Sequence, residues 1–110
     1  MPHQHPHGYQ ISKSKIITAS VDAAFTAWTD ESVRNKWLIY PVIAIRKATL
    51  NHTLRITWVD GFTSLNVSFY SRGEKVHVSV NHRNLSDSQK AEVMKEYWAD
   101  QLIKLADFLE

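Results

Sequence analysis

The apolar residues of the last stretch, 86–109, recur at spacings of three and four. They are Ala91, Met94, Trp98, Leu102, Leu105 and Leu109. This is the period of one face of an α-helix, and no proline or glycine interrupts it. Ser86 and Gln89 have the spacing of a capping box at its start. The pattern predicts a long amphipathic helix, which needs a broad apolar partner surface.

The chain between residues 42 and 82 has the patterns of strands instead. Residues 42–48 form a continuous, β-branched stretch, and residues 53–59, 64–71 and 75–82 alternate apolar and polar positions. Strands are predicted at all four stretches. Turns are expected at Asn51-His52, Asp60-Gly61 and Arg72-Gly73. Asp-Gly favours a two-residue type I′ turn, because both central residues of that turn need a positive φ.

Two-residue loops at these last two turns would set the strand register. The first pairs Ile56 with Leu65, and the second pairs Leu65 with Val80. Both place apolar residues opposite each other, as a one-sided antiparallel meander requires. The face that results is the surface needed by the final helix, and it carries Leu54, Ile56, Trp58, Leu65, Val67, Phe69, Val76, Val78 and Val80.

The N-terminal part is expected to add a tail, one strand and two short helices. Residues 1–8 are a Pro/His/Gly segment, interpreted as a flexible tail. Its residues His3, His5 and His7 could hold a metal loosely, but the tail interpretation is favoured. A strand at 10–19 follows. Ser20 is a candidate N-cap for a helix through Trp28, and a second short helix runs to about Leu38.

These elements predict an α+β domain over residues 9–110. The order is β-α-α-β-β-β-β-α, with a curved antiparallel sheet of about five strands packed on a long C-terminal helix.

Composition narrows the function classes. The 110 residues suit one domain. The 13 Lys and Arg residues are scattered, whereas nucleic-acid binders concentrate theirs, so no nucleic-acid partner is expected. The chain has no cysteine for disulfides or thiolate chemistry. No apolar run is long enough to insert into a membrane, and no signal peptide is evident, so a cytoplasmic protein is expected.

Several short motifs, in order, carry a resemblance to a known family. They are Ile16-Ile17-Thr18-Ala19, Ala27-Trp28-Thr29-Asp30, Lys36-Trp37-Leu38, Thr57-Trp58-Val59-Asp60-Gly61, and Trp98 with Leu102 and Leu105. From about Tyr9 to Glu110 the chain resembles the START-like, birch-pollen-allergen-like superfamily, also called SRPBCC or helix-grip. Its most similar groups are the activators of heat-shock-protein-90 ATPase and the polyketide-cyclase-like domains.

The resemblance implies a helix-grip fold and a hydrophobic-ligand cavity between sheet and helix. Fuller members carry an additional hairpin, so a smaller sheet and cavity are expected here, as in a short bacterial variant. Pro6-His7-Gly8-Tyr9 resembles the junction at which, in some bacterial relatives, such a domain follows a small helical domain.

No catalytic constellation is evident in the sequence, and neither a catalytic residue, a metal site nor a cofactor is predicted. His82 is the candidate acid/base group, and it could also donate a hydrogen bond to a ligand. The predicted register places it opposite Thr63, on the apolar face at the end of the sheet, where a cavity could open. The favoured alternative is a half-exposed histidine that ends its strand and bonds to nearby backbone.

Three functions remain open. The first is binding of a small hydrophobic molecule in a cavity expected to be lined by Trp28, Trp37, Trp58, Thr63, Phe69, His82, Met94, Trp98 and Leu102. For each tryptophan, core filling is the more favoured role. The second is a co-chaperone-like module with a protein partner, or a homodimer. The third and least favoured is a cyclase or dehydratase, because it needs positioned acid/base groups.

Overall fold

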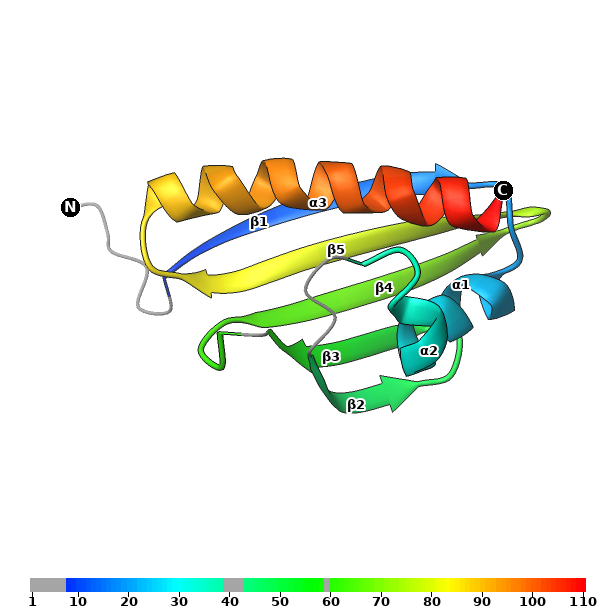
Figure 1. The fold of residues 1–110 in the computed structure, drawn as a ribbon, viewed down its shortest axis with the longest axis horizontal. Helices are drawn as coiled ribbons and strands as arrows, with labels where there is room; N and C mark the ends of the chain where they lie inside the picture. Colours follow the sequence, from blue (N-terminus) through cyan, green and yellow to red (C-terminus); the bar gives the residue numbers. More distant parts are fainter. Residues whose placement is uncertain (1–7, 39–42, 59) are drawn as a thin grey trace.

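The computed structural model describes residues 8–38, 43–58 and 60–110. Eight elements follow one another in the predicted order β-α-α-β-β-β-β-α (Figure 1). They are β1 Tyr9–Ile17, α1 Val21–Thr29, α2 Glu31–Arg34, β2 Ala44–Thr49, β3 Thr53–Thr57, β4 Ser64–Arg72, β5 Lys75–Leu85 and α3 Ser88–Leu109. Residues 1–7 of the predicted tail and residue 42 of the strand predicted at 42–48 lie outside the described residues.

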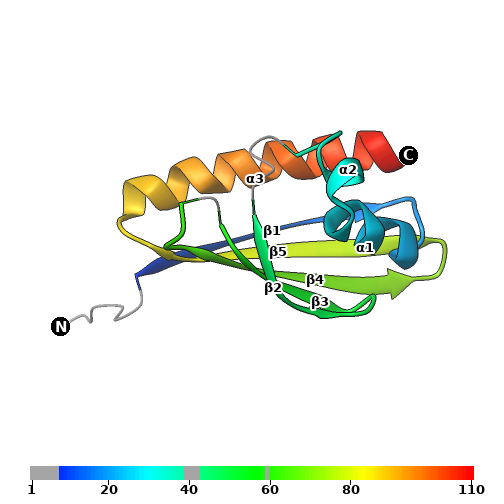
Figure 2. The same cartoon turned by 60° about the horizontal axis from the view of Figure 1, so that its bottom comes forward.

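The five strands form one antiparallel sheet in the order β1-β5-β4-β3-β2. Figure 2 shows α1, α2 and α3 together on one side of this sheet. The long helix α3 runs above β1 and β5, while α1 packs on β4 and β5 near the C-terminal end of α3. The predicted α+β class and the five-stranded curved sheet under a long C-terminal helix are therefore confirmed.

The core lies between the sheet and the helices. Every residue predicted for the apolar sheet face is buried: Leu54, Ile56, Trp58, Leu65, Val67, Phe69, Val76, Val78 and Val80. The α3 stripe meets this face, with Trp98 and Leu105 fully buried. The period of two in the strands therefore identified the apolar face of the sheet, and the period of about 3.6 in the last helix identified the stripe that packs on it.

The β3–β4 hairpin has the predicted register but a wider loop. Ile56 pairs with Leu65 and Leu54 with Val67. The Trp58 N–H donates to the Thr63 carbonyl at 2.9 Å, so the loop spans the residues between these two. The carboxylate of Asp60 accepts hydrogen bonds from backbone N–H groups within the loop, a common use of Asp in turns. The predicted pairing of Val59 with Phe62 falls on residue 59, outside the described residues.

The predicted β4–β5 register is wrong by two residues. Arg72 pairs with Lys75, so the turn is at Gly73-Glu74, and Leu65 lies opposite His82 rather than Val80. Gly73 has a φ of 68°, and a type II′ turn needs such a positive φ at its first central residue. A shift of two keeps every side chain on its face, so apolar matching could not detect it.

The predicted N-cap of the last helix is also wrong by one position. Asp87, not Ser86, is the N-cap of α3, and its side chain accepts a hydrogen bond from the Lys90 N–H at 2.8 Å. Asp and Ser are comparably good caps, so residue type alone did not decide between them. The third residue of the helix is then Lys90, and the expected capping box with Gln89 is absent.

The cap assignment predicts different effects for two neighbouring alanine substitutions. Asp87→Ala should lower the free energy of unfolding by about 1 kcal/mol, because the Lys90 N–H loses its acceptor. Ser86→Ala should change it by only a few tenths of a kcal/mol, as is usual for surface substitutions. Urea unfolding followed by circular dichroism measures both. A larger loss for Ser86→Ala than for Asp87→Ala would contradict the assignment.

Candidate functional site

A cleft of about 590 Å³ opens at the end of the molecule where α3 begins. Its walls come from the β3–β4 loop, the end of β5 and the first turns of α3, which lie together on the left of Figure 1, away from α1 and α2. The lining residues are Trp58, Asp60, Phe62, Thr63, His82, Asn84, Leu85, Ser86, Lys90, Val93 and Met94.

The nine predicted cavity residues divide between the cleft and the core. Those that line the cleft are Trp58, Thr63, His82 and Met94. The others are buried in the hydrophobic core behind it: Trp28, Trp37, Phe69, Trp98 and Leu102. Trp37 also borders a smaller surface depression of about 370 Å³ beside the end of α3. Contact of any of these residues with a ligand remains a prediction.

The tryptophans form a continuous aromatic chain from the short helices to the cleft. The rings of Trp28 and Trp37 meet edge to face at 5.0 Å between centroids, and those of Trp28 and Trp98 stack at 5.8 Å. Trp98 then contacts Trp58 at 5.2 Å. Such pairs favour fixed ring geometries beyond their burial. The core predicted to be filled by tryptophans thus extends up to one wall of the cleft.

A chain of polar contacts links this core to the cleft. The indole Nε1–H of Trp98 donates to His82 Nδ1 at 3.0 Å. His82 Nε2 lies 2.8 Å from Thr63 Oγ1. The Thr63 hydroxyl is 2.9 Å from Asp60 Oδ2 and 3.0 Å from Asp60 Oδ1. We call these four residues the polar relay.

The relay has a single direction. An indole N–H can only donate, so His82 Nδ1 must be the acceptor and the ring proton of neutral His82 resides on Nε2. His82 therefore donates to Thr63, and Thr63 donates its hydroxyl proton to the acceptor-only carboxylate of Asp60. Every proton is directed from the core toward the cleft.

Burial sets the charge state of the relay. His82 is fully buried, and desolvation lowers its pKa to about 4, against a smaller opposing effect of Asp60. For Asp60, desolvation acts to raise the pKa, but hydrogen bonds from the N–H groups of Thr63 and Phe62 and from the Thr63 hydroxyl outweigh it, so the pKa is lowered. At neutral pH the relay therefore contains a neutral imidazole, at His82, and an ionised carboxylate, at Asp60.

This geometry corrects the interpretation of His82. The ring is not half exposed and bonded to backbone, but fully buried between two side chains. With both nitrogens engaged and its pKa far below neutral, it has no free site for proton transfer near pH 7. Its contact with Thr63 is as predicted, although the two residues are diagonal rather than directly opposite.

Sequence reasoning missed several lining residues. Asp60 was seen only as a turn residue, and Phe62 and Val93 were not singled out. Val93 did leave a signal, because it is an apolar residue off the buried stripe of α3, and its side chain is 61% exposed. Which other residues line the cleft depends on which end of the sheet the helices leave uncovered, and the sequence pattern does not show this.

The described residues contain no group of three His, Asp or Glu side chains placed to hold a metal ion. Among the helices that the structure describes, none is both long and apolar enough to cross a membrane.

Comparison with known proteins gives likeness in structure only. No family model and no curated protein matches the sequence. CalU16 from Micromonospora echinospora superposes with a TM-score of 0.78 at 18% identity, over 92% of this chain and 74% of that one. The Aha1 dimer from Colwellia psychrerythraea gives 0.78 at 18%, over 93% and 96%. The AHSA1-like protein RHE_CH02687 from Rhizobium etli gives 0.72 at 15%, over 89% and 79%.

The chain has the START-like helix-grip fold. This confirms the fold that the resemblance of the sequence motifs implied. In this helix-grip domain the space between sheet and helix is filled near α1 and α2, and a cleft opens beside the start of α3.

The buried imidazole predicts an acid-dependent stability. In the unfolded chain His82 takes up a proton below its ordinary pKa of 6.5, whereas the folded domain holds a pKa of about 4. Unfolding is therefore coupled to proton uptake between these values, and the contribution of His82 is complete above pH 6.5. The free energy of unfolding should fall by about 3 kcal/mol as the pH drops from 6.5 to 4. Urea unfolding at stepped pH measures this.

The test variant is His82→Gln, whose amide supplies a donor and an acceptor but does not titrate in this range. It should remove most of this slope, while His52→Gln in the exposed β2–β3 turn should keep it. In the wild-type protein, the imidazole nitrogen chemical shifts should report a proton on Nε2. A slope unchanged by His82→Gln, or a proton on Nδ1, would contradict the relay.

Proposed function

We propose that this helix-grip domain binds a small hydrophobic molecule in the cleft beside the start of α3. The observation that carries the proposal is the cleft itself, at about 590 Å³, within the usual range for small-molecule sites. Its apolar walls are formed by Trp58, Phe62, Leu85, Val93 and Met94. A few polar groups stand among them, as is typical of such sites.

The exposure of the cleft mouth supports the same function. Phe62 is 85% exposed and Val93 is 61% exposed, and both line the cleft. Apolar side chains that border one concavity are typical of a binding surface. A ligand that covered them would gain roughly 25 cal/mol for each Å² of apolar surface removed from water.

Blocking the mouth should abolish binding without disturbing the fold. Val93→Trp places a bulky ring at the rim, on a side chain that is mostly exposed. We expect it to weaken binding of octanol by at least about tenfold, because the ligand loses most of its apolar contact area. Backbone amide shifts in an NMR titration measure the affinity and locate the site.

The matched control is Ile103→Trp, on the same helix, at a side chain that is 51% exposed and does not line the cleft. It should bind octanol as the wild-type protein does. The proposal fails if octanol and other apolar probes leave the shifts of Trp58, Thr63 and Met94 unchanged.

A second candidate, a protein-interaction module or homodimer, is supported by a separate observation. One of the superposing structures is that of a dimer, the Aha1 dimer from Colwellia psychrerythraea, of which the match covers 96%. In this chain α3 also exposes Ile103 and Phe108 outside the cleft. Exposed apolar residues along one helix suit contact with a second protein surface.

Self-association is the form of this candidate that can be tested directly. For a homodimer, sedimentation equilibrium should give twice the chain mass of 12.7 kDa. Phe108→Asp should shift the equilibrium toward the monomer, because a charge replaces apolar contact area. A monomeric mass at every concentration would remove the homodimer from consideration.

A further inference from the structure

We propose that the cleft selects amphipathic ligands whose polar end donates a hydrogen bond, which the carboxylate of Asp60 receives. A hydroxyl or an ammonium group has this chemistry, whereas a carboxylate does not. The inference rests on the proposed ligand-binding function of the cleft and adds the class of ligand.

The direction of the polar relay carries the argument. Trp98 donates to His82, His82 donates to Thr63, and Thr63 donates to Asp60. The last group of the series is the one at the cleft mouth, and it is an acceptor with no proton to give. Hydrogen bonds accepted by a carboxylate favour its ionised form, so the relay keeps Asp60 an acceptor with no proton to give.

The two oxygens of Asp60 are used unequally. Oδ1 accepts from the Phe62 N–H at 2.8 Å, the Thr63 N–H at 2.9 Å and the Thr63 hydroxyl at 3.0 Å. In the described part of the chain, Oδ2 accepts only from the Thr63 hydroxyl, at 2.9 Å. A carboxylate oxygen has about two acceptor positions, so Oδ2 retains capacity for a donor in the cleft that Asp60 lines.

Asp60 is also better placed than the other charged residue of the lining, Lys90. The loop holds the Asp60 carboxylate in place through several hydrogen bonds, so it loses little freedom when it binds a ligand. The ammonium group of exposed Lys90 sits on a flexible stem and must be ordered first, which opposes binding. The preorganised group should therefore determine which polar end is preferred.

Three probes with the same alkyl chain test this: octanol, octylammonium and octanoate. We expect octanol and octylammonium to bind the wild-type protein more tightly than octanoate, with octylammonium preferred by at least about tenfold, as a charge-assisted hydrogen bond allows. Asp60→Asn keeps an oxygen for the loop N–H groups but presents an amide donor beside it. This variant should lose the preference for octylammonium and gain affinity for octanoate.

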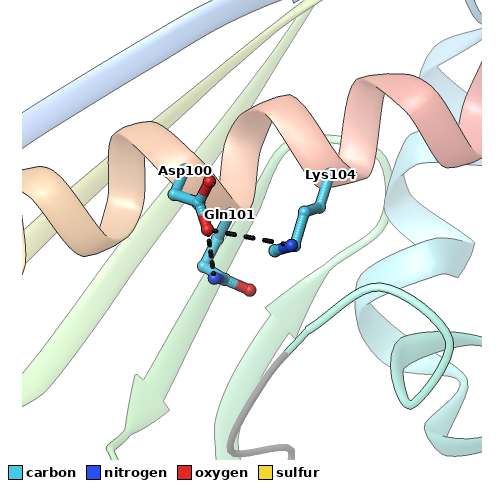
Figure 3. Close-up of polar contacts among 3 residues, drawn as sticks. All are labelled: Asp100, Gln101 and Lys104. Atoms are coloured by element: carbon cyan, nitrogen blue, oxygen red, sulfur yellow. Dashed lines mark hydrogen bonds and ion pairs between the residues drawn. The ribbon is translucent and has the colours of Figure 1, made fainter.

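The matched control is Asp100→Asn, which removes the same charge from α3 outside the cleft lining. Figure 3 shows Asp100 with its neighbours Gln101 and Lys104. Asp100 Oδ2 lies 3.4 Å from Gln101 Nε2 and 3.9 Å from Lys104 Nζ. This variant should keep the wild-type preference. Octanoate binding to the wild-type protein as tightly as octylammonium, or an equal change in both variants, would overturn the inference while ligand binding stands. If none of the three probes binds at the cleft, the proposed function fails and the inference with it.

Discussion

The hydrogen bond from Trp98 to His82 is the contact on which the rest of the structure depends. Both side chains are fully buried, and a buried indole N–H without an acceptor would cost about 1–3 kcal/mol. The strand β5 supplies that acceptor at one position, so the bond fixes both the rotation of α3 and its placement along the sheet. The aromatic neighbours Trp28 and Trp58 then pack against a ring whose orientation is already set.

The location of the cleft follows from the residues along α3. Where the helix covers the sheet beside α1, its buried stripe consists of Trp98, Leu102 and Leu105, and these large side chains fill the space. Toward its start the stripe continues with Ala91 and Met94, which are small or flexible, and the short helices α1 and α2 lie at the other end of α3. The same helix therefore closes one end of the sheet and leaves room at the other.

Sequence patterns predicted the faces of the elements well and their exact pairing less well. The period of two assigned Leu65 and His82 to the inner face, but it could not show that they lie opposite each other, because a shift of two residues preserves the pattern. The contact of Thr63 with His82 was still predicted, since both registers bring the two residues close together. Asp87 and Ser86 are adjacent and comparably good caps, so the start of α3 depended on backbone geometry. The roles of Asp60 and Phe62 depend on the loop conformation and on which end of the sheet is uncovered, and no local pattern encodes either.

The single direction of the polar relay also limits how this sequence can vary. Each of Asp60, Thr63, His82 and Trp98 donates to or accepts from the next residue of the relay, so an apolar replacement of one leaves a neighbour without its hydrogen-bond partner. An apolar residue at position 82, for example, removes both the acceptor of Trp98 and the donor to Thr63. A substitution at one of the four positions is therefore expected to require a compensating substitution at another. Among homologous chains they should covary, with position 82 becoming apolar only where position 98 no longer carries an indole.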